Sequence, residues 1–283
     1  MRKKLLLPTD FSENSWNAIV YAITMFQKVQ CDFYLLNLFQ STGYSLDNFM
    51  VPEPGEKNYE ALQEKSGNGL ARTLERITEL EDNPNHEFFL ISEYNSMVEG
   101  IKNCVAKKDI ELIVMGTKGN TNADHVIYGS NAVQVMDQVT NCPVLAIPTT
   151  ARFKRPKEIV FPTNYKTHFK RRELQHLVEL VKLNNSTLIL LYIAEDDTLS
   201  KEQQENQKLL LENLDEVSYK LQNLHHPDVK SGLNCFVESR DSDLVTFVNR
   251  KHGFFEQIVS KPLVKDLGYR SKVPVLALHE FPE

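Results

Sequence analysis

Short apolar runs alternate with amphipathic segments through the first half of the chain. The first run, residues 4–8, predicts a buried strand, and Ser12 is placed to cap a helix that continues to about residue 29. Apolar residues spaced three or four apart predict further helices over residues 59–81 and 96–107. Other apolar runs predict strands over residues 33–38, 87–91, 111–115 and 143–147. Because strands that alternate with helices pair in parallel, we expect an α/β fold.

The second half of the chain repeats the first after a linker at residues 152–156. Three stretches recur in the same order, and a shared order is better explained by tandem duplication than by coincidence. We therefore predict two domains, residues 1–150 and 151–283. The matching stretches are 3–11 (KKLLLPTDF) with 157–165 (KEIVFPTNY), 31–38 with 186–193, and 141–147 (NCPVLAI) with 272–278 (KVPVLAL).

The second copy carries a shortened pattern. Apolar runs at residues 233–237 and 244–248 both look like strands, and the segment between them is too short for a parallel crossover. Either these runs pair antiparallel or one of them is not a strand. On this pattern the second copy lacks a helix, and we expect a degenerate version of the first domain.

A glycine-rich stretch between the fourth and fifth strands carries the candidate chemistry. It has the spacing G-x2-G-x9-G-S, built on Gly116, Gly119, Gly129 and Ser130. Glycine lets the backbone approach a ligand closely. A helix that begins at Gly129 and Ser130 would direct free N–H groups and a positive dipole end at a phosphate. Lys118 could add a mobile positive charge.

Asp10 follows the first strand and is the candidate partner of the glycine loop. Ligands of parallel sheets bind beyond the carboxyl ends of the strands, where the winding direction reverses. If the first and fourth strands are neighbours, Asp10 faces the loop across that crevice, where a carboxylate suits a ribose hydroxyl or a divalent cation. In the second copy Asn164 replaces Asp10, and Ser260 and Lys261 fall opposite Gly129 and Ser130.

Each of these residues also has a purely structural explanation. Asp10 could cap the helix after the first strand, and this role can coexist with ligand binding. Gly119 could be a turn residue, and Gly129 and Ser130 could begin a helix that binds nothing. Lys118 could be a solvated surface charge.

Composition and charge exclude several classes of function. A formal charge of −6 argues against a general binder of nucleic acids or membrane surfaces. The apolar run near the amino terminus is too short for the core of a signal peptide, and no apolar run is long enough to span a bilayer. No spacing typical of a metal site occurs. We expect a cytoplasmic protein whose four cysteines are buried thiols: Cys31, Cys104, Cys142 and Cys235.

The combination PTD, GTKG, GS and PVLAI, between Pro8 and Ile147, resembles the ATP-binding branch of the universal stress protein family. That resemblance implies parallel five-stranded sheets of order 3-2-1-4-5, with helices on both faces, in two tandem doubly wound domains. It also implies that the last strands of the two domains pair antiparallel, which would make the chain an intrachain pseudo-dimer. Two chains could associate further into a homodimer.

The same resemblance implies roles for individual residues. Asp10 and the backbone of Pro8 and Thr9 would lie against ribose and adenine, and the main chain of Leu38 would contact adenine. Asn131, followed by Ala132, departs from the small apolar residue and hydroxyl that the family often has there. The ribose and phosphates would be held by Gly116, Gly119, Gly129, Ser130 and Asn131.

The sequence favours a regulator that binds one adenine nucleotide per chain, ATP or ADP with or without Mg2+, and acts on an unidentified protein partner. Phosphoryl transfer relies on several positioned charges, and the sequence offers Asp10 alone, so we expect little or no turnover of ATP. The alternative is a scaffold whose site is empty or holds another small molecule. An adenylyl-transferring enzyme is disfavoured because neither HxGH nor SGGxDS occurs at the first strand turn.

Overall fold

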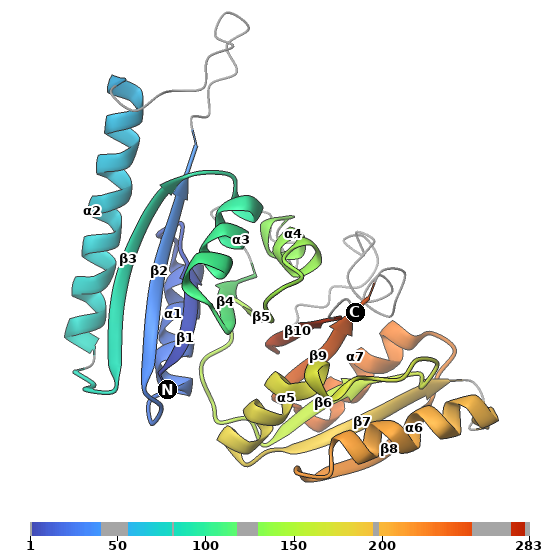
Figure 1. Cartoon of the computed structure of the whole chain (residues 1–283). Helices are drawn as coiled ribbons and strands as arrows, with labels where there is room; N and C mark the ends of the chain where they lie inside the picture. The colour runs from blue at the N-terminus through green and yellow to red at the C-terminus, as the bar shows by residue number, and fades with distance from the viewer. Residues whose placement is uncertain are drawn as a thin grey trace, which may run out of the picture. The chain divides into compact units, whose positions relative to one another are not determined.

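The computed structural model describes residues 2–40, 56–80, 82–117, 130–194, 198–250 and 273–280. The chain forms two compact units, Met1–Cys142 and Pro143–Glu283 (Figure 1). Each unit is built around a mainly parallel sheet with helices on both faces, so the fold class predicted from the sequence is confirmed.

The described residues of the first unit form four parallel strands in the spatial order β3-β2-β1-β4. Helices α1 and α2 pack on one face of this sheet, and α3 and α4 lie together on the other (Figure 1). The strands are β1 (Lys3–Pro8), β2 (Cys31–Phe39), β3 (His86–Tyr94) and β4 (Leu112–Gly116), and the helices are α1 (Glu13–Met25), α2 (Lys57–Leu80), α3 (Met97–Lys108) and α4 (Ser130–Gln138).

The apolar pattern explains why β1 lies at the centre. Leu5, Leu6 and Leu7 are each fully buried, because helices cover both faces of a parallel sheet and leave no residue of a central strand in water. At the start of α1, the side chain of Ser12 accepts a hydrogen bond from the backbone N–H of Ser15 at 3.2 Å. The cap predicted at Ser12 is therefore confirmed.

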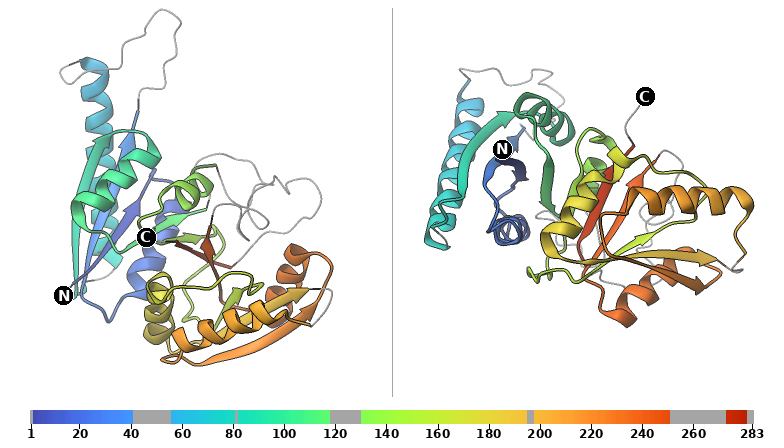
Figure 2. Two further views of the ribbon diagram at one scale, coloured as in Figure 1. Left: turned by 45° about the vertical axis from the view of Figure 1, so that its right-hand side comes forward. Right: turned by 60° about the horizontal axis from the view of Figure 1, so that its bottom comes forward.

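The second unit repeats this arrangement with the order β8-β7-β6-β9-β10, which is 3-2-1-4-5 when its own strands are counted along the chain. Helices α6 and α7 lie on opposite faces of its sheet (Figure 2, right). The strands are β6 (Glu158–Pro162), β7 (Thr187–Ala194), β8 (Tyr219–His225), β9 (Leu244–Asn249) and β10 (Val275–His279), and the helices are α5 (Arg171–Asn184), α6 (Lys201–Asn213) and α7 (Val229–Arg240).

Strand β5 (Val144–Ile147) falls in the second unit, where it pairs antiparallel with β10. Leu145 lies opposite Leu276, and Ala146 lies opposite Val275. These are the two PVLA strands that close the repeated halves, and the antiparallel pairing predicted for them is confirmed.

Two predictions for the second half were wrong, and both errors have one cause. The apolar run at residues 233–237 lies inside α7, so it is not a strand, and the helix predicted to be missing is present. Cys235, predicted to be buried, is exposed, because only one side of this helix packs on the sheet. The strand that precedes α7 is β8, which lies at the edge of the sheet and has a largely polar sequence, so apolar runs do not predict it.

Candidate functional site

The reversal of winding expected between the first and fourth strands is present in the first unit. Strands β1 and β4 are parallel neighbours, with Leu5 opposite Leu112 and Leu6 opposite Ile113. The chain winds from β1 toward β2 over one face of the sheet and reaches β4 over the other, so the winding direction reverses between β1 and β4. The carboxyl ends of β1 and β4 therefore flank the position at which parallel sheets bind ligands.

Asp10 lies exposed in the turn that joins β1 to α1. Its Oδ1 accepts a hydrogen bond from the N–H of Ser12 at 3.1 Å, and Thr9 Oγ1 accepts one from the N–H of Phe11 at 3.0 Å. Phe11 adopts a φ of 63°, which is the left-handed region that a side chain of its size rarely occupies. Two side-chain acceptors thus hold this turn in an uncommon conformation.

The second unit contains the same turn with an asparagine in place of the aspartate. Asn164 Oδ1 accepts from the N–H of Lys166 at 3.0 Å, Thr163 Oγ1 accepts from the N–H of Tyr165 at 3.2 Å, and Tyr165 has a φ of 54°. The conformation therefore needs an acceptor oxygen at this position and not a negative charge. The recurrence of an aromatic residue after PTD and PTN was the sequence signal for this turn.

The main chain of Thr9 is already engaged in the fold. Its N–H donates to the carbonyl of Leu36 at 2.8 Å, and its carbonyl accepts from Asn37 Nδ2 at 2.7 Å. Pro8 is buried beside it. The side chain of Leu38 lies so close to α3 that a Cβ added to Gly100 would be 2.4 Å from Leu38 Cδ2. Four residues of the first two strands and the β1–α1 turn were predicted to contact the nucleotide: Pro8, Thr9, Asp10 and Leu38. Among them, Asp10 is the one whose side chain is exposed to solvent.

Gly116 is the last residue of β4, where α1 approaches the sheet. A Cβ at this position would lie 2.5 Å from Asn14 Nδ2 and 3.0 Å from the backbone carbonyl oxygen of Asn14. Close packing of α1 on β4 therefore requires a glycine here, whether or not a ligand is bound.

We expect Gly116→Ala to destabilise the protein by about 1–3 kcal/mol, the usual cost of forcing extra atoms into a packed contact. Gly67 in α2 is the matched control, because a Cβ there has nothing within 4 Å. Gly67→Ala should stabilise by roughly 0.5–1 kcal/mol through helix propensity. Urea denaturation followed by circular dichroism measures both. An equal change in the two variants would contradict the packing role of Gly116.

The predicted phosphate loop lies mostly outside the residues that the structure describes. The structure does not describe Lys118, Gly119 and Gly129, nor the side chain of Ser130. Helix α4 begins at Ser130, and Asn131 is exposed in its first turn. Asp10 and Gly116 thus lie at the ends of neighbouring strands, and their relation to the rest of the loop stays a prediction.

The corresponding position in the second unit is occupied by a buried ion pair that sequence reasoning missed. Arg250 follows β9, the counterpart of β4, and its Nη2 lies 2.8 Å from Oε2 of Glu173 in α5. The side chain of Glu173 is fully buried. Arg250 also donates to the carbonyl of His168 at 2.9 Å and lies 4.9 Å from the ring centre of Phe169. An ion pair between Arg250 and α5 therefore lies directly after β9.

Two further classes of site find no support among the described residues. No helix there combines the length and the apolar sequence needed to cross a membrane. In the same part of the chain, no three histidine, cysteine or acidic side chains come close enough together to hold a metal ion.

Comparison with known proteins agrees with this architecture. A model of the universal stress protein family matches residues 1–148. A universal stress protein of Methanocaldococcus jannaschii is 26% identical over 161 residues, which cover 55% of this chain and 84% of that protein. The crystal structure of a universal stress protein from Archaeoglobus fulgidus aligns with a TM-score of 0.64 at 17% identity, covering 97% of this chain and 95% of the other. A protein of unknown function from Pseudomonas aeruginosa aligns with a TM-score of 0.57 at 12% identity, covering 98% and 92% of the two chains. Because the family model spans more than half of the sequence, the chain belongs to the universal stress protein family.

Proposed function

We propose that the first unit binds one adenine nucleotide, ATP or ADP, at the crevice between β1 and β4, and that the protein acts as a cytoplasmic stress-response regulator. The observation that carries this proposal is the pair of matching turns at Asp10 and Asn164. Both turns make the same hydrogen bonds, so the negative charge of Asp10 has no structural task that asparagine could not perform. A charge that the fold does not need, exposed at the ligand-binding edge of the sheet, is available to a ligand.

The expected contacts follow from the chemistry of the nucleotide. The carboxylate of Asp10 accepts hydrogen bonds from ribose hydroxyls or holds Mg2+, since both suit an anionic oxygen. The phosphates lie against the backbone of Gly119 and Gly129, where Lys118 adds a positive charge. Helix α4 begins at Ser130, so its free N–H groups and positive dipole end are available to the phosphates.

The second unit supports a stoichiometry of one nucleotide per chain. It has asparagine in place of Asp10, and the ion pair of Glu173 and Arg250 lies directly after β9. A nucleotide there would have to displace a buried salt bridge, and separating such a pair leaves a charge without compensation. The second unit thus keeps the fold and gives up the site.

We propose regulation and not turnover as the purpose of the site. Phosphoryl transfer relies on several positioned charges, and the crevice supplies Asp10 and the backbone groups of a glycine loop. A bound nucleotide would instead alter the surface around the β1–α1 turn and α4, where a protein partner could recognise the difference.

The decisive test has two parts. Mass spectrometry identifies the small molecules that the purified protein releases when it is denatured, and calorimetry measures the binding of ATP to the intact protein. We expect a single site per chain. If millimolar ATP does not bind and no nucleotide is released, the nucleotide proposal is wrong and the alternative of a scaffold protein is favoured.

Asp10→Asn is the sharpest variant because the protein itself shows that asparagine supports this turn. We expect the folded stability to change by less than about 0.5 kcal/mol, as for an exposed substitution, while the affinity for ATP falls roughly tenfold or more through loss of a charge-assisted hydrogen bond. Gly129→Val should abolish binding by filling the phosphate space. Asn164→Asp is the control, and it should create no second site.

A further inference from the structure

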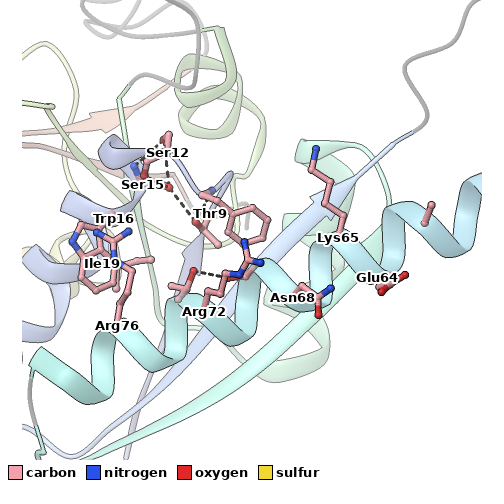
Figure 3. Close-up of a pocket in the computed structure, with 14 residues that line it drawn as sticks. Thr9, Ser12, Ser15, Trp16, Ile19, Glu64, Lys65, Asn68, Arg72 and Arg76 are labelled. Atoms are coloured by element: carbon pink, nitrogen blue, oxygen red, sulfur yellow. Dashed lines mark hydrogen bonds between the residues drawn. The ribbon is translucent and has the colours of Figure 1, made fainter.

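A cavity of about 580 Å3 lies between α1 and α2, on the face of the first unit's sheet that these helices cover (Figure 3). It opens beside the β1–α1 turn. Thr9 lines it, whereas Asp10, Leu38 and Gly116 are not among its described lining residues. The cavity is therefore separate from the crevice at the carboxyl ends of β1 and β4.

Three cationic side chains of α2 line this cavity: Lys65, Arg72 and Arg76. Their spacing of seven and then four residues places them in one stripe along the helix. Figure 3 shows all three extending from α2 on the side that faces α1 and the turn. One carboxylate, that of Glu64, also lies in the lining, so the charges of the described lining residues leave a surplus of positive charge in a chain whose formal charge is −6.

Arg76 already has partners. Its Nη2 lies 3.6 Å from Oε1 of Glu13, and its guanidinium lies over the ring of Trp16 at 3.9 Å from the ring centre. Lys65 and Arg72, by contrast, form no ion pair with any residue in the described part of the chain. Two cations thus remain available to an anion in the cavity.

Hydroxyl groups line the opposite wall. Thr9 Oγ1 and Ser15 Oγ are 3.0 Å apart, Ser12 lies beside them at the cap of α1, and Thr73 lies across from them on α2. Phe11 and Gly69 both line the cavity, and the Phe11 ring contacts α2 at Gly69. A Cβ added to Gly69 would lie 2.4 Å from Phe11 Cζ. The left-handed turn at Phe11 therefore shapes this wall.

In the part of the second unit that the structure describes, neutral side chains of α6 contact the equivalent turn. There the side chains of Gln203 and Asn206 on α6 reach the equivalent turn and donate to the carbonyls of Asn164 and Tyr165 at 2.8 and 2.9 Å. Neutral amides thus join helix and turn directly in the second unit, whereas cations line a cavity in the first. The stripe of charge on α2 is not a requirement of the fold.

We propose that the cavity between α1 and α2 binds a small molecule that carries a phosphate group. Arg72 and Lys65 would take the phosphate oxygens, since a guanidinium and an ammonium make charge-assisted hydrogen bonds to such groups. The hydroxyl of Ser15 already donates to the carbonyl of Ser12 at 2.9 Å, so the two cations supply the main donors. The side chain of Ile19 also lines the cavity and offers an apolar contact to the rest of the molecule. Because Thr9 holds the β1–α1 turn, occupation of the cavity would be felt at Asp10 on the other side of that turn.

Trp16 is the single tryptophan of the chain and lines the cavity, so its fluorescence reports on the occupant. The experiment titrates the full chain with phenyl phosphate at constant ionic strength and measures binding in parallel by calorimetry. We expect saturable binding with a change in emission. The double variant Lys65→Gln/Arg72→Gln should raise the Kd at least tenfold and leave ATP binding unchanged. Lys57→Gln, a charge removed from α2 outside the cavity, is the matched control and should keep the Kd of the parent protein.

A further arm separates this cavity from the proposed nucleotide site. Gly129→Val should retain the binding of phenyl phosphate even where it loses ATP. Loss of phenyl phosphate binding in Gly129→Val would assign the signal to the nucleotide crevice and overturn the proposal. The absence of saturable binding by calorimetry, or an equal loss in Lys57→Gln, would overturn it as well.

Discussion

Replacing Arg250 with methionine should destabilise the protein by about 3–5 kcal/mol, the cost of removing one partner from a buried ion pair. The carboxylate of Glu173 is fully buried, and Arg250 Nη2 lies 2.8 Å from its Oε2. Without the guanidinium, the hydrogen bond that remains to that oxygen from the described residues is the one from the N–H of Lys170 at 3.0 Å. A buried negative charge would then lack compensation. Urea denaturation followed by far-ultraviolet circular dichroism measures the loss.

A double variant shows whether the burial of charge is the reason. Glu173→Gln/Arg250→Met removes both charges and keeps an oxygen that can accept the bond from Lys170, so it should cost less than Arg250→Met alone. The exposed pair of Lys208 and Glu212, 4.0 Å apart, is the matched control, and Lys208→Met should cost less than about 1 kcal/mol. Additive costs in the double variant would contradict this account.

The apolar pattern was enough to predict most of the elements, because buried parallel strands read as continuous apolar runs. Residues 4–8 and 186–193 are examples, and both correspond to central strands, β1 and β7. The repeat predicted a second copy of the first domain. The strand order 3-2-1-4-5 and the antiparallel pairing of β5 with β10 were implied by the resemblance to the universal stress protein family, and the structure contains both.

Short runs were where the pattern failed. Residues 233–237 are equally compatible with a buried strand and with one face of a helix, and periodicity alone cannot separate the two. The missing information was tertiary: β8 lies at the edge of its sheet, where polar residues are tolerated, so the strand that would have completed the pattern was not apolar. With β8 in place, α7 is the crossover that the second half needs.

The candidate site was predictable in part, and the limit lies in contacts between distant residues. The position of Asp10 at the end of β1, beside β4, followed from topology. The packing of Gly116 against Asn14 did not, because it depends on how closely α1 approaches the sheet. The cavity wall formed by Lys65 and Arg72 did not follow either, because it depends on the arrangement of α1 beside α2.

Acidification should destabilise the protein through His279. This residue ends β10, and its side chain is buried at 4% exposure. Burial penalises the charged imidazolium and lowers the pKa of His279 from 6.5 to about 4. The unfolded chain therefore binds a proton at a higher pH than the folded chain does. The stabilising contribution is complete above about pH 6.5 and is lost as the pH falls toward 4, by roughly 2 kcal/mol between pH 7 and 5 and roughly 3 kcal/mol by pH 4.

Urea denaturation at pH 7, 6 and 5 measures this slope, in a range where most carboxylates keep their charge. His279→Asn, which cannot titrate, should lose less stability than the parent protein over the same range. His176→Asn, at a partly exposed histidine of α5, is the matched control for removing a histidine that is not buried. If His279→Asn and the parent protein show the same dependence on pH, burial of a neutral imidazole at the end of β10 does not govern the response to acid.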